Sequence, residues 1–203
     1  YGEGDVFLGL TVGQSRAIAK KFVGISFSEI EPLLASGIHE ERLVGLLILV
    51  QKFGKADVRG QKEVFDFFLG HTAGVNNWDL VDLSAHKIVG EYLFNRPKKV
   101  LFKLAKSKDL WEKRIAIIST FAFIKKGSFD ETLEISEVLL KDKHDLIHKA
   151  VGWMLREVGK RDLAVEEKFL KKHYREMPRT MLRYAIEKFP EKKRQAYLKG
   201  TIK

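Results

Sequence analysis

The sequence predicts an all-α fold, a HEAT-like α-solenoid of the ARM/HEAT superhelix type. Only four Pro occur among 203 residues, and β-branched residues never form alternating runs. Apolar residues recur every three or four positions, which is the spacing of one buried helix face. A repeat of just under 40 residues, with two helices per unit, is typical of HEAT-like arrays. We therefore expect about six helix pairs around a concave basic groove.

Starts and stops along the chain place the helices. Capping residues or Pro begin them, and Gly, Asn or Pro end them. No linker or low-complexity segment interrupts the chain, so we expect a single domain over residues 1–203. It begins at Tyr1 and could lack a leading helix. The expected helices are 11–22, one from Ser26 or Ser28 to Gly37, 38–53, 60–71, 77–94, 97–105, 109–125, one opened by a Ser128–Glu131 capping box, 143–158, 162–174, 178–189 and 191–198.

The repeat becomes visible when five of these helices are aligned. Their aligned starts are 36, 36, 35 and 34 residues apart, and the first column is basic at every position but one. A column facing a groove would form a cationic stripe along a phosphate backbone, whereas the alternative is solvated surface charge. A column that is charged in four repeats should not enter the core in the fifth, so Trp78 is expected to be exposed and to face the groove. The first column reads Arg42, Trp78, Arg114, Lys149, Arg183, and the column four residues later reads Leu46, Asp82, Ile118, Trp153, Glu187.

Composition favours a polyanionic partner. The formal charge is +10 and the pI is near 9.6, so nucleic acid is the first candidate and an anionic membrane surface the second. The sequence contains no run of roughly 18 apolar residues, which is the length needed to span a bilayer. Cysteine is absent, which excludes disulfides and thiolate zinc sites. We expect a cytoplasmic, nucleoid-associated protein that needs neither metal nor cofactor.

The segment 76–83 holds an unusual group of residues for a basic chain. Asn77 or Asn76 can cap a helix here, and the helix dipole tolerates Asp79 in the first turn. A well-capped helix with acidic first-turn residues is one interpretation. The other starts from Trp78 and Asp82, which are four residues apart and therefore share one helix face.

Four separated segments resemble the DNA alkylation repair enzymes, the AlkD-like HEAT-repeat DNA glycosylases. Residues 7–10 also resemble the entry segment of that family, although the proline expected shortly after them is absent. The similarity runs over nearly the whole chain. The four segments are 77–82 (NWDLVD), 111–117 (WEKRIAI), 149–157 (KAVGWMLRE) and 178–188 (PRTMLRYAIEK).

The resemblance implies hydrolysis of the N-glycosidic bond of N3- and N7-alkylated purines in duplex DNA, with the base left stacked. It implies that Trp78 and Trp153 pack against the deoxyribose of the lesion. Asp82 would be the catalytic carboxylate, and Arg114 would hold the adjacent phosphate. An open groove without a deep purine pocket, tolerant of bulky adducts, is therefore expected.

The chemistry is consistent with these residue types. An alkylated purine is a cation and leaves without a general acid, while positive charge develops on the sugar. A carboxylate beside C1′ stabilises that charge and can orient or deprotonate the attacking water. Two indole faces add about 0.5–2 kcal/mol each. Asp79 is the rival carboxylate, but it lies off the Trp78 face and is expected to cap the helix or pair with a base such as Arg156.

Other candidates carry weaker signals. His144 and His148 are four residues apart but lack the Glu of the zincin motif, so we expect a solvated or phosphate-contacting pair. No Lys stands in the motif for a Schiff base, which predicts a monofunctional enzyme. Five basic residues are candidate phosphate contacts, although each could equally be a surface charge or an intramolecular ion pair: Lys113, Lys149, Arg156, Arg179 and Arg183.

The sequence thus predicts a monomeric alkylpurine DNA glycosylase acting on double-stranded DNA. A non-catalytic HEAT-repeat protein that binds duplex or branched DNA is the alternative. A protein-interaction scaffold, the commonest use of α-solenoids, is a third class. The sequence does not rank 3-methyladenine, 7-methylguanine and bulky adducts as substrates.

Overall fold

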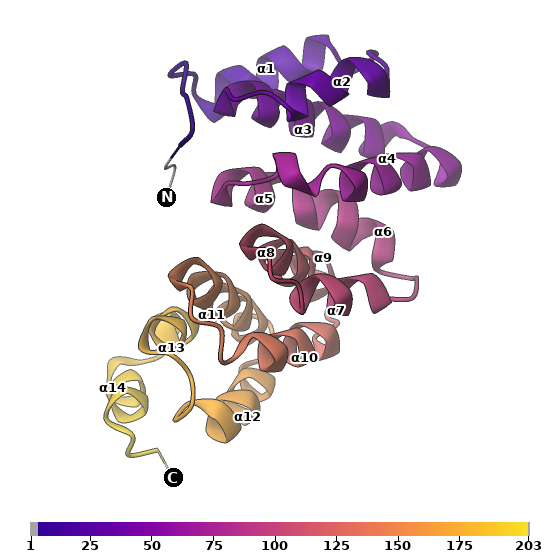
Figure 1. Cartoon of the computed structure of the whole chain (residues 1–203). Helices are drawn as coiled ribbons and strands as arrows, with labels where there is room; N and C mark the ends of the chain where they lie inside the picture. Colours follow the sequence, from indigo (N-terminus) through magenta and orange to yellow (C-terminus); the bar gives the residue numbers. More distant parts are fainter. Residues whose placement is uncertain (1–3, 203) are drawn as a thin grey trace. The chain divides into compact units, whose positions relative to one another are not determined.

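Helices make up nearly all regular structure in the computed structural model, which describes residues 4–202 (Figure 1). These residues form no β-strand, and their only extended pairing is an isolated bridge between Val6 and Ile38. The predicted all-α class is therefore confirmed. Contacts between residues divide the chain into two compact units, 1–96 and 97–203, called here the N-terminal unit and the C-terminal unit. The single domain over 1–203 stays a prediction.

Helix α3 is the centre of the N-terminal unit. Its middle, from Leu43 to Leu49, is apolar on every side and entirely buried, because α1, α2, α4 and α5 all pack against it. A helix that is apolar all round is stable only when neighbours cover it. The helices of this unit are α1 (Val12–Lys21), α2 (Phe27–Leu34), α3 (His39–Lys55), α4 (Val58–Gly70), the 3₁₀ turn η1 (Thr72–Gly74), α5 (Trp78–Ala85), η2 (His86–Gly90) and α6 (Glu91–Leu93).

The predicted helix 77–94 is interrupted in its middle. It begins at Trp78 with Asn77 as its cap, as expected, but η2 is a π-helical stretch between α5 and α6. Both Ile88 and Val89 of this π turn are fully buried. One predicted helix is therefore two short α-helices joined by a π turn.

Helix α11 is the centre of the C-terminal unit, and α8, α12 and α13 pack against it. Its approach to α13 is close at Gly152, where a Cβ atom would lie 2.4 Å from the carbonyl oxygen of Met181. Only glycine allows that approach. The helices are α7 (Lys99–Ala105), α8 (Leu110–Ser119), α9 (Phe121–Ile124), α10 (Asp130–Leu139), α11 (Asp145–Gly159), α12 (Leu163–His173), α13 (Arg179–Ala185), η3 (Ile186–Lys188) and α14 (Glu191–Lys199).

Two predicted helices of this unit differ from the structure. The expected helix 109–125 is divided at Thr120, whose hydroxyl donates to the carbonyl of Ile117 and so competes with the helical pattern. The expected capping box at Ser128 and Glu131 is wrong. The N-cap of helix α10 is Phe129, which makes no side-chain capping hydrogen bond. Ser128 and Glu131 contact each other only through their side chains, at 3.5 Å.

Candidate active site

Helix α5 presents the tryptophan predicted to be exposed. Trp78 is its first residue, and 45% of this residue is accessible to solvent. The side chain of Asn77 accepts a hydrogen bond from the backbone N–H of Trp78 at 2.7 Å, which fixes the start of the helix. Large exposed aromatic side chains on a well-ordered helix start are suited to contact a ligand. The expected exposure of Trp78 is confirmed, and its place in a groove stays a prediction.

One helical turn later, Asp82 is half-buried on the face that also carries Trp78. Asp79 has a different environment, because its carboxylate lies 2.8 Å from Nε2 of His39 and also accepts the backbone N–H of Leu80. Asp79 does contact a basic residue, as expected, but that residue is His39 and not Arg156. Arg156 pairs instead with Glu187 inside the C-terminal unit.

In the C-terminal unit, two adjacent basic residues connect α8 to the first turn of α11 and to the turn that precedes it. The guanidinium of Arg114 donates to the carbonyl oxygen of Leu146 at 2.6 Å, and Nζ of Lys113 lies 2.5 Å from Asp142. Burial would raise the pKa of Asp142, but hydrogen bonds from Lys113 and from the N–H of His144 outweigh it and hold the pKa below its ordinary value. Lys113 therefore lies beside an ionised partner.

The expected cationic stripe is wrong at two of its positions. Arg42 is 3% exposed and Arg114 is 4% exposed, so neither forms part of a solvent-facing column. Arg42 donates to Asp5 and to the carbonyl of Ser36. The long aliphatic stems of these arginines are packed into the helix array while their guanidinium groups bind acceptors inside the protein.

Trp153 is half-buried on α11, with its ring centroid 6.0 Å from that of Phe121. Two cations approach the same phenyl ring, Lys125 at 5.2 Å and Arg161 at 5.9 Å. The sequence interpretation missed this aromatic and basic cluster. The four-residue spacing of Phe121 and Lys125 on one helical path is the signal that could have revealed part of it.

The remaining predicted phosphate contacts fall into two groups. Lys149 forms an ion pair with Asp145 at 2.7 Å, and Arg156 is paired as described above. Arg179 and Arg183 lie exposed on α13, although Arg179 also donates to the carbonyl of Leu198 at 2.8 Å. The predicted histidine pair, His144 and His148, forms hydrogen bonds within the protein.

The histidine pair stabilises the start of α11. Nδ1 of His144 accepts the N–H of Leu146 at 3.2 Å, while Nε2 of His148 lies 2.6 Å from the carbonyl oxygen of Asp142. Residues 4–202 contain no group of three His, Cys, Asp or Glu side chains placed to hold a metal ion. Within the same residues, no helix is long and apolar enough to cross a membrane.

The structure revises the register of the repeat alignment. Counted from the first residue of each helix, Arg114, Lys149 and Arg183 all stand fifth, in α8, α11 and α13. The fifth residue of α5 is Asp82, and Trp78 is its first. Asp82 therefore occupies, in α5, the position that carries a basic residue in the three later helices. Trp78 is exposed as expected, but the alignment column that led to this expectation was wrong.

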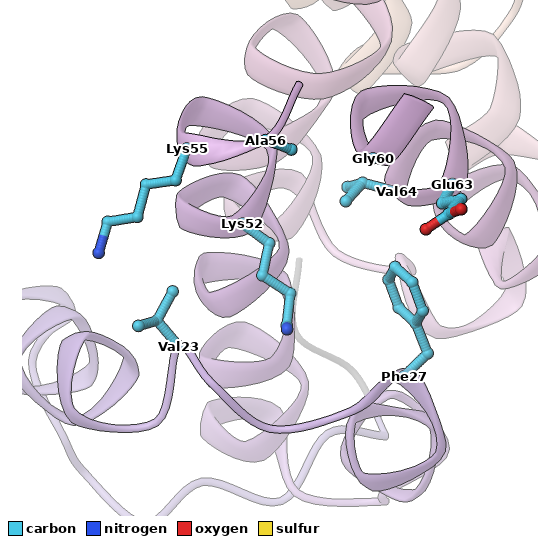
Figure 2. A pocket seen from close by; sticks show the side chains of 8 residues that line it. All are labelled: Val23, Phe27, Lys52, Lys55, Ala56, Gly60, Glu63 and Val64. Carbon is cyan, nitrogen blue, oxygen red and sulfur yellow. The ribbon is translucent and has the colours of Figure 1, made fainter. Parts of the chain in front are cut away.

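Two cavities have linings that include neither Trp78, Trp153 nor Asp82. The first, of about 340 Å³, is in the N-terminal unit, where Lys52 and Lys55 extend from α3 toward Phe27 and Val23 (Figure 2). The second, of about 430 Å³, is a basic depression in the C-terminal unit. It lies beside the start of α11 and is lined by Lys113, Lys141, Asp142, Lys143 and His144.

Comparison with known proteins agrees with this architecture. The sequence model of a family described as DNA alkylation repair enzyme matches residues 1–189. A solved structure described as a predicted DNA alkylation repair enzyme from Enterococcus faecalis is similar in fold, with a TM-score of 0.72 and 18% identity over 93% of this chain and 90% of that one. No curated protein sequence matches significantly. Since the family match extends over nearly all of its sequence, this chain belongs to the DNA alkylation repair enzyme family.

Proposed function

We propose that the protein is a monofunctional DNA glycosylase that removes cationic N3- and N7-alkylpurines, such as 3-methyladenine and 7-methylguanine, from duplex DNA. The observation that carries the proposal is the start of α5. There an exposed indole and a half-buried carboxylate, Trp78 and Asp82, share one face one turn apart. Membership of a DNA repair family supports a DNA substrate.

The reaction divides into bond cleavage and water addition. The C1′–N bond breaks, and its electron pair passes to the purine nitrogen and neutralises the cationic base. Positive charge remains on the sugar, where the Asp82 carboxylate stabilises it and orients water. The water oxygen bonds to C1′ and releases a proton to Asp82 or to solvent, which leaves an abasic site. A cationic leaving group needs no general acid.

Two residues of the C-terminal unit are proposed to assist, as the family resemblance implies. Trp153 would pack against the deoxyribose through its half-buried indole. Arg114 would hold a backbone phosphate, for which its guanidinium would have to share or exchange the carbonyl of Leu146. We propose that the site reads the sugar and the backbone without extrusion of the base into a pocket, as the family resemblance implies. We expect a monomer acting at the nucleoid.

The test is release of free base from a duplex oligonucleotide carrying one 7-methylguanine. Asp82→Asn keeps the size of the side chain and removes its charge. We expect it to lower the single-turnover rate by about 10²–10³-fold while DNA affinity is retained. Asp66→Asn is the matched control, because Asp66 is an exposed residue of α4 that pairs with Lys62.

Equal rates for wild type and Asp82→Asn would refute the role of Asp82. If neither protein releases base but both bind duplex DNA with the same salt dependence, the protein is a non-catalytic DNA binder. In that case Trp78 would remain a recognition residue. An absence of DNA affinity even at low salt would favour a protein-interaction scaffold.

A further inference from the structure

A buried polar cluster connects three segments of the N-terminal unit at the start of α5. Nδ1 of His39 lies 3.0 Å from Oδ2 of Asp5, and Nε2 lies 2.8 Å from Oδ2 of Asp79. The side-chain amide of Asn77 donates to Asp5 at 2.8 Å, and Arg42 donates to the other oxygen of Asp5 at 2.6 Å. The imidazole ring of His39 therefore connects α3 both to residues 5–10, called here the N-terminal segment, and to α5.

Both ring nitrogens of His39 face carboxylates. A carboxylate only accepts hydrogen bonds, so a neutral ring donates to one of the two and an imidazolium donates to both. Burial would raise the pKa of Asp5, but the hydrogen bonds from Asn77, His39 and Arg42 outweigh burial and hold that pKa below its ordinary value. Asp5 is thus an ionised partner.

The cluster places His39 and Arg42 among two carboxylates. Asp5 lies against both His39 and Arg42, whereas Asp79 lies against His39. Because the cluster is largely buried, a carboxylate that loses its partner here is costly. Glu40 lies next in sequence, but its carboxylate is occupied by the N–H groups of the N-terminal segment. The ring of Phe7 covers His39, with the ring centroids 4.8 Å apart.

The N-terminal segment is attached to α3 without the His39 side chain. Glu40 accepts the backbone N–H groups of Leu8, Gly9 and Leu10 at 2.9, 2.8 and 3.2 Å, where Gly9 has a φ of +84°. The backbone N–H of His39 also donates to the carbonyl of Val6 at 2.9 Å. Removing the imidazole therefore leaves this segment in place. What is lost is the direct contact between His39 and Asp79 of α5.

We propose that His39 is a positioning residue that fixes the direction of Trp78 and Asp82, because it holds Asp79 directly and helps Arg42 to hold the Asp5 carboxylate that binds Asn77. This inference rests on the proposed glycosylase function. Asn77 precedes Trp78, and Asp79 lies between Trp78 and Asp82 in the first turn of α5. A displacement of about 1 Å at reacting groups can cost about 100-fold in rate, and charge-assisted hydrogen bonds on both sides of Trp78 prevent it.

The test separates rate from binding and from stability. We propose His39→Gln, which can satisfy one carboxylate but not both, with His71→Gln as the control, because His71 lies at the end of α4 and faces Glu31 at 3.5 Å. With 7-methylguanine duplex and saturating enzyme, His39→Gln should lower the single-turnover rate about 10–100-fold. Its Kd for DNA should stay within about threefold, measured well below the melting temperature. His71→Gln should match wild type.

A double-mutant cycle tests the connection itself. Asp79→Asn should show a similar loss of rate, and the variant with both changes should lose little more than either alone, because both remove the same contact. Losses of rate that add up in the double variant would overturn the connection between His39 and Asp79.

The outcomes distinguish this inference from the proposed function. If wild type releases base, Asp82→Asn does not, and His39→Gln is as fast as wild type, only the positioning role is overturned. A loss of melting temperature with an unchanged rate per folded molecule would likewise leave His39 a purely structural residue. If wild type releases no base, the glycosylase proposal fails and the positioning role fails with it.

Discussion

The two compact units carry opposite charges. Residues 1–96 contain 10 Lys and Arg against 12 Asp and Glu, a net charge of −2, while residues 97–203 contain 27 against 15, a net charge of +12. Together they give the +10 of the chain. The excess that predicts a polyanionic partner thus belongs entirely to the C-terminal unit.

In the proposed reaction, this difference would separate cleavage of the glycosidic bond from attraction of DNA. The charge of the whole chain does not show this separation. A developing cation on a sugar is stabilised by a carboxylate, and Asp82 lies in the unit with a slight negative charge. Attraction of DNA needs positive charge, which the C-terminal unit supplies. We infer that affinity depends mainly on residues 97–203 and that bond cleavage depends mainly on α5.

The units also differ in how they hold a buried acid. In the N-terminal unit, burial would raise the pKa of Glu40, but the N–H groups of Leu8, Gly9 and Leu10 outweigh it and lower that pKa. In the C-terminal unit, Glu166 is 1% exposed, and its Oε1 has no hydrogen-bond partner. Burial and the neighbouring charge of Glu167 raise its pKa to about 8, against a smaller opposing effect of Arg156. Glu40 is held as an anion and Glu166 as a neutral acid.

The largest expected effect is on the pH dependence of stability. The pKa of Glu166 rises from an ordinary 4.5 in the unfolded chain to about 8 in the folded one, so unfolding releases a proton between these values. Stability is lost as pH rises through this window and levels off above it. At about 1.4 kcal/mol per unit, the loss is on the order of 3–5 kcal/mol.

Glu166→Gln removes this titration. Thermal or urea unfolding at several pH values should show that the stability of the variant relative to wild type increases from pH 5 to pH 8. Above pH 8 the difference in stability should stay constant. The exposed Glu134 of α10 provides the control, and Glu134→Gln should follow wild type at every pH. A gap between Glu166→Gln and wild type that does not change with pH would contradict a neutral Glu166.

A second prediction concerns DNA affinity and compares equal charge losses in the two units. Replacing both Arg179 and Arg183 of α13 by Gln should shift the slope of log affinity against log salt by about 1.8. Near 0.1 M salt this corresponds to roughly 50-fold weaker binding. Fluorescence anisotropy with an undamaged duplex measures it.

The matched variant replaces Lys20 and Lys21 by Gln. Both are exposed in the last turn of α1, so the same two charges are removed from the N-terminal unit. We expect less than threefold weaker binding, since these residues lie outside the unit that holds the excess charge. Comparable losses in the two variants would show that the charge difference between the units does not govern affinity.

The smallest expected effect is at Glu40. Glu40→Gln keeps an acceptor for the N-terminal segment but loses the charge that strengthens three hydrogen bonds. We expect a loss of about 1–3 kcal/mol at pH 7. Because the folded pKa is lowered, this stability is present above the ordinary value of 4.5 and disappears as pH falls below it.

Urea unfolding of Glu40→Gln at pH 7 and at pH 3.5 checks the expected loss. The difference from wild type should be larger at pH 7. Glu41→Gln, in the next position of α3, should change stability by less than about 0.5 kcal/mol at both pH values. An equal cost for the two substitutions would mean that the three N–H contacts add nothing specific.

Local patterns in the sequence determined the helical class and most helix positions. These follow from features within a few residues of one another, such as the periodicity of apolar side chains or Asn77 before Trp78. The family segments are of the same kind, and the family match confirms the resemblance. Where a local pattern competed with another local bond, as at Thr120 or in the π turn after Asp82, sequence alone placed the boundary wrongly.

Only the tertiary structure decided what the polar residues do. Arg42 and Arg114 look like surface charges in the sequence, yet packing buries them on acceptors 37 and 32 residues away. The partner of Asp79 is His39, 40 residues earlier, and nothing in either local sequence indicates the pair. Periodicity determines which face of a helix is buried, whereas the choice of a polar partner depends on distances between segments that only the packed chain brings together.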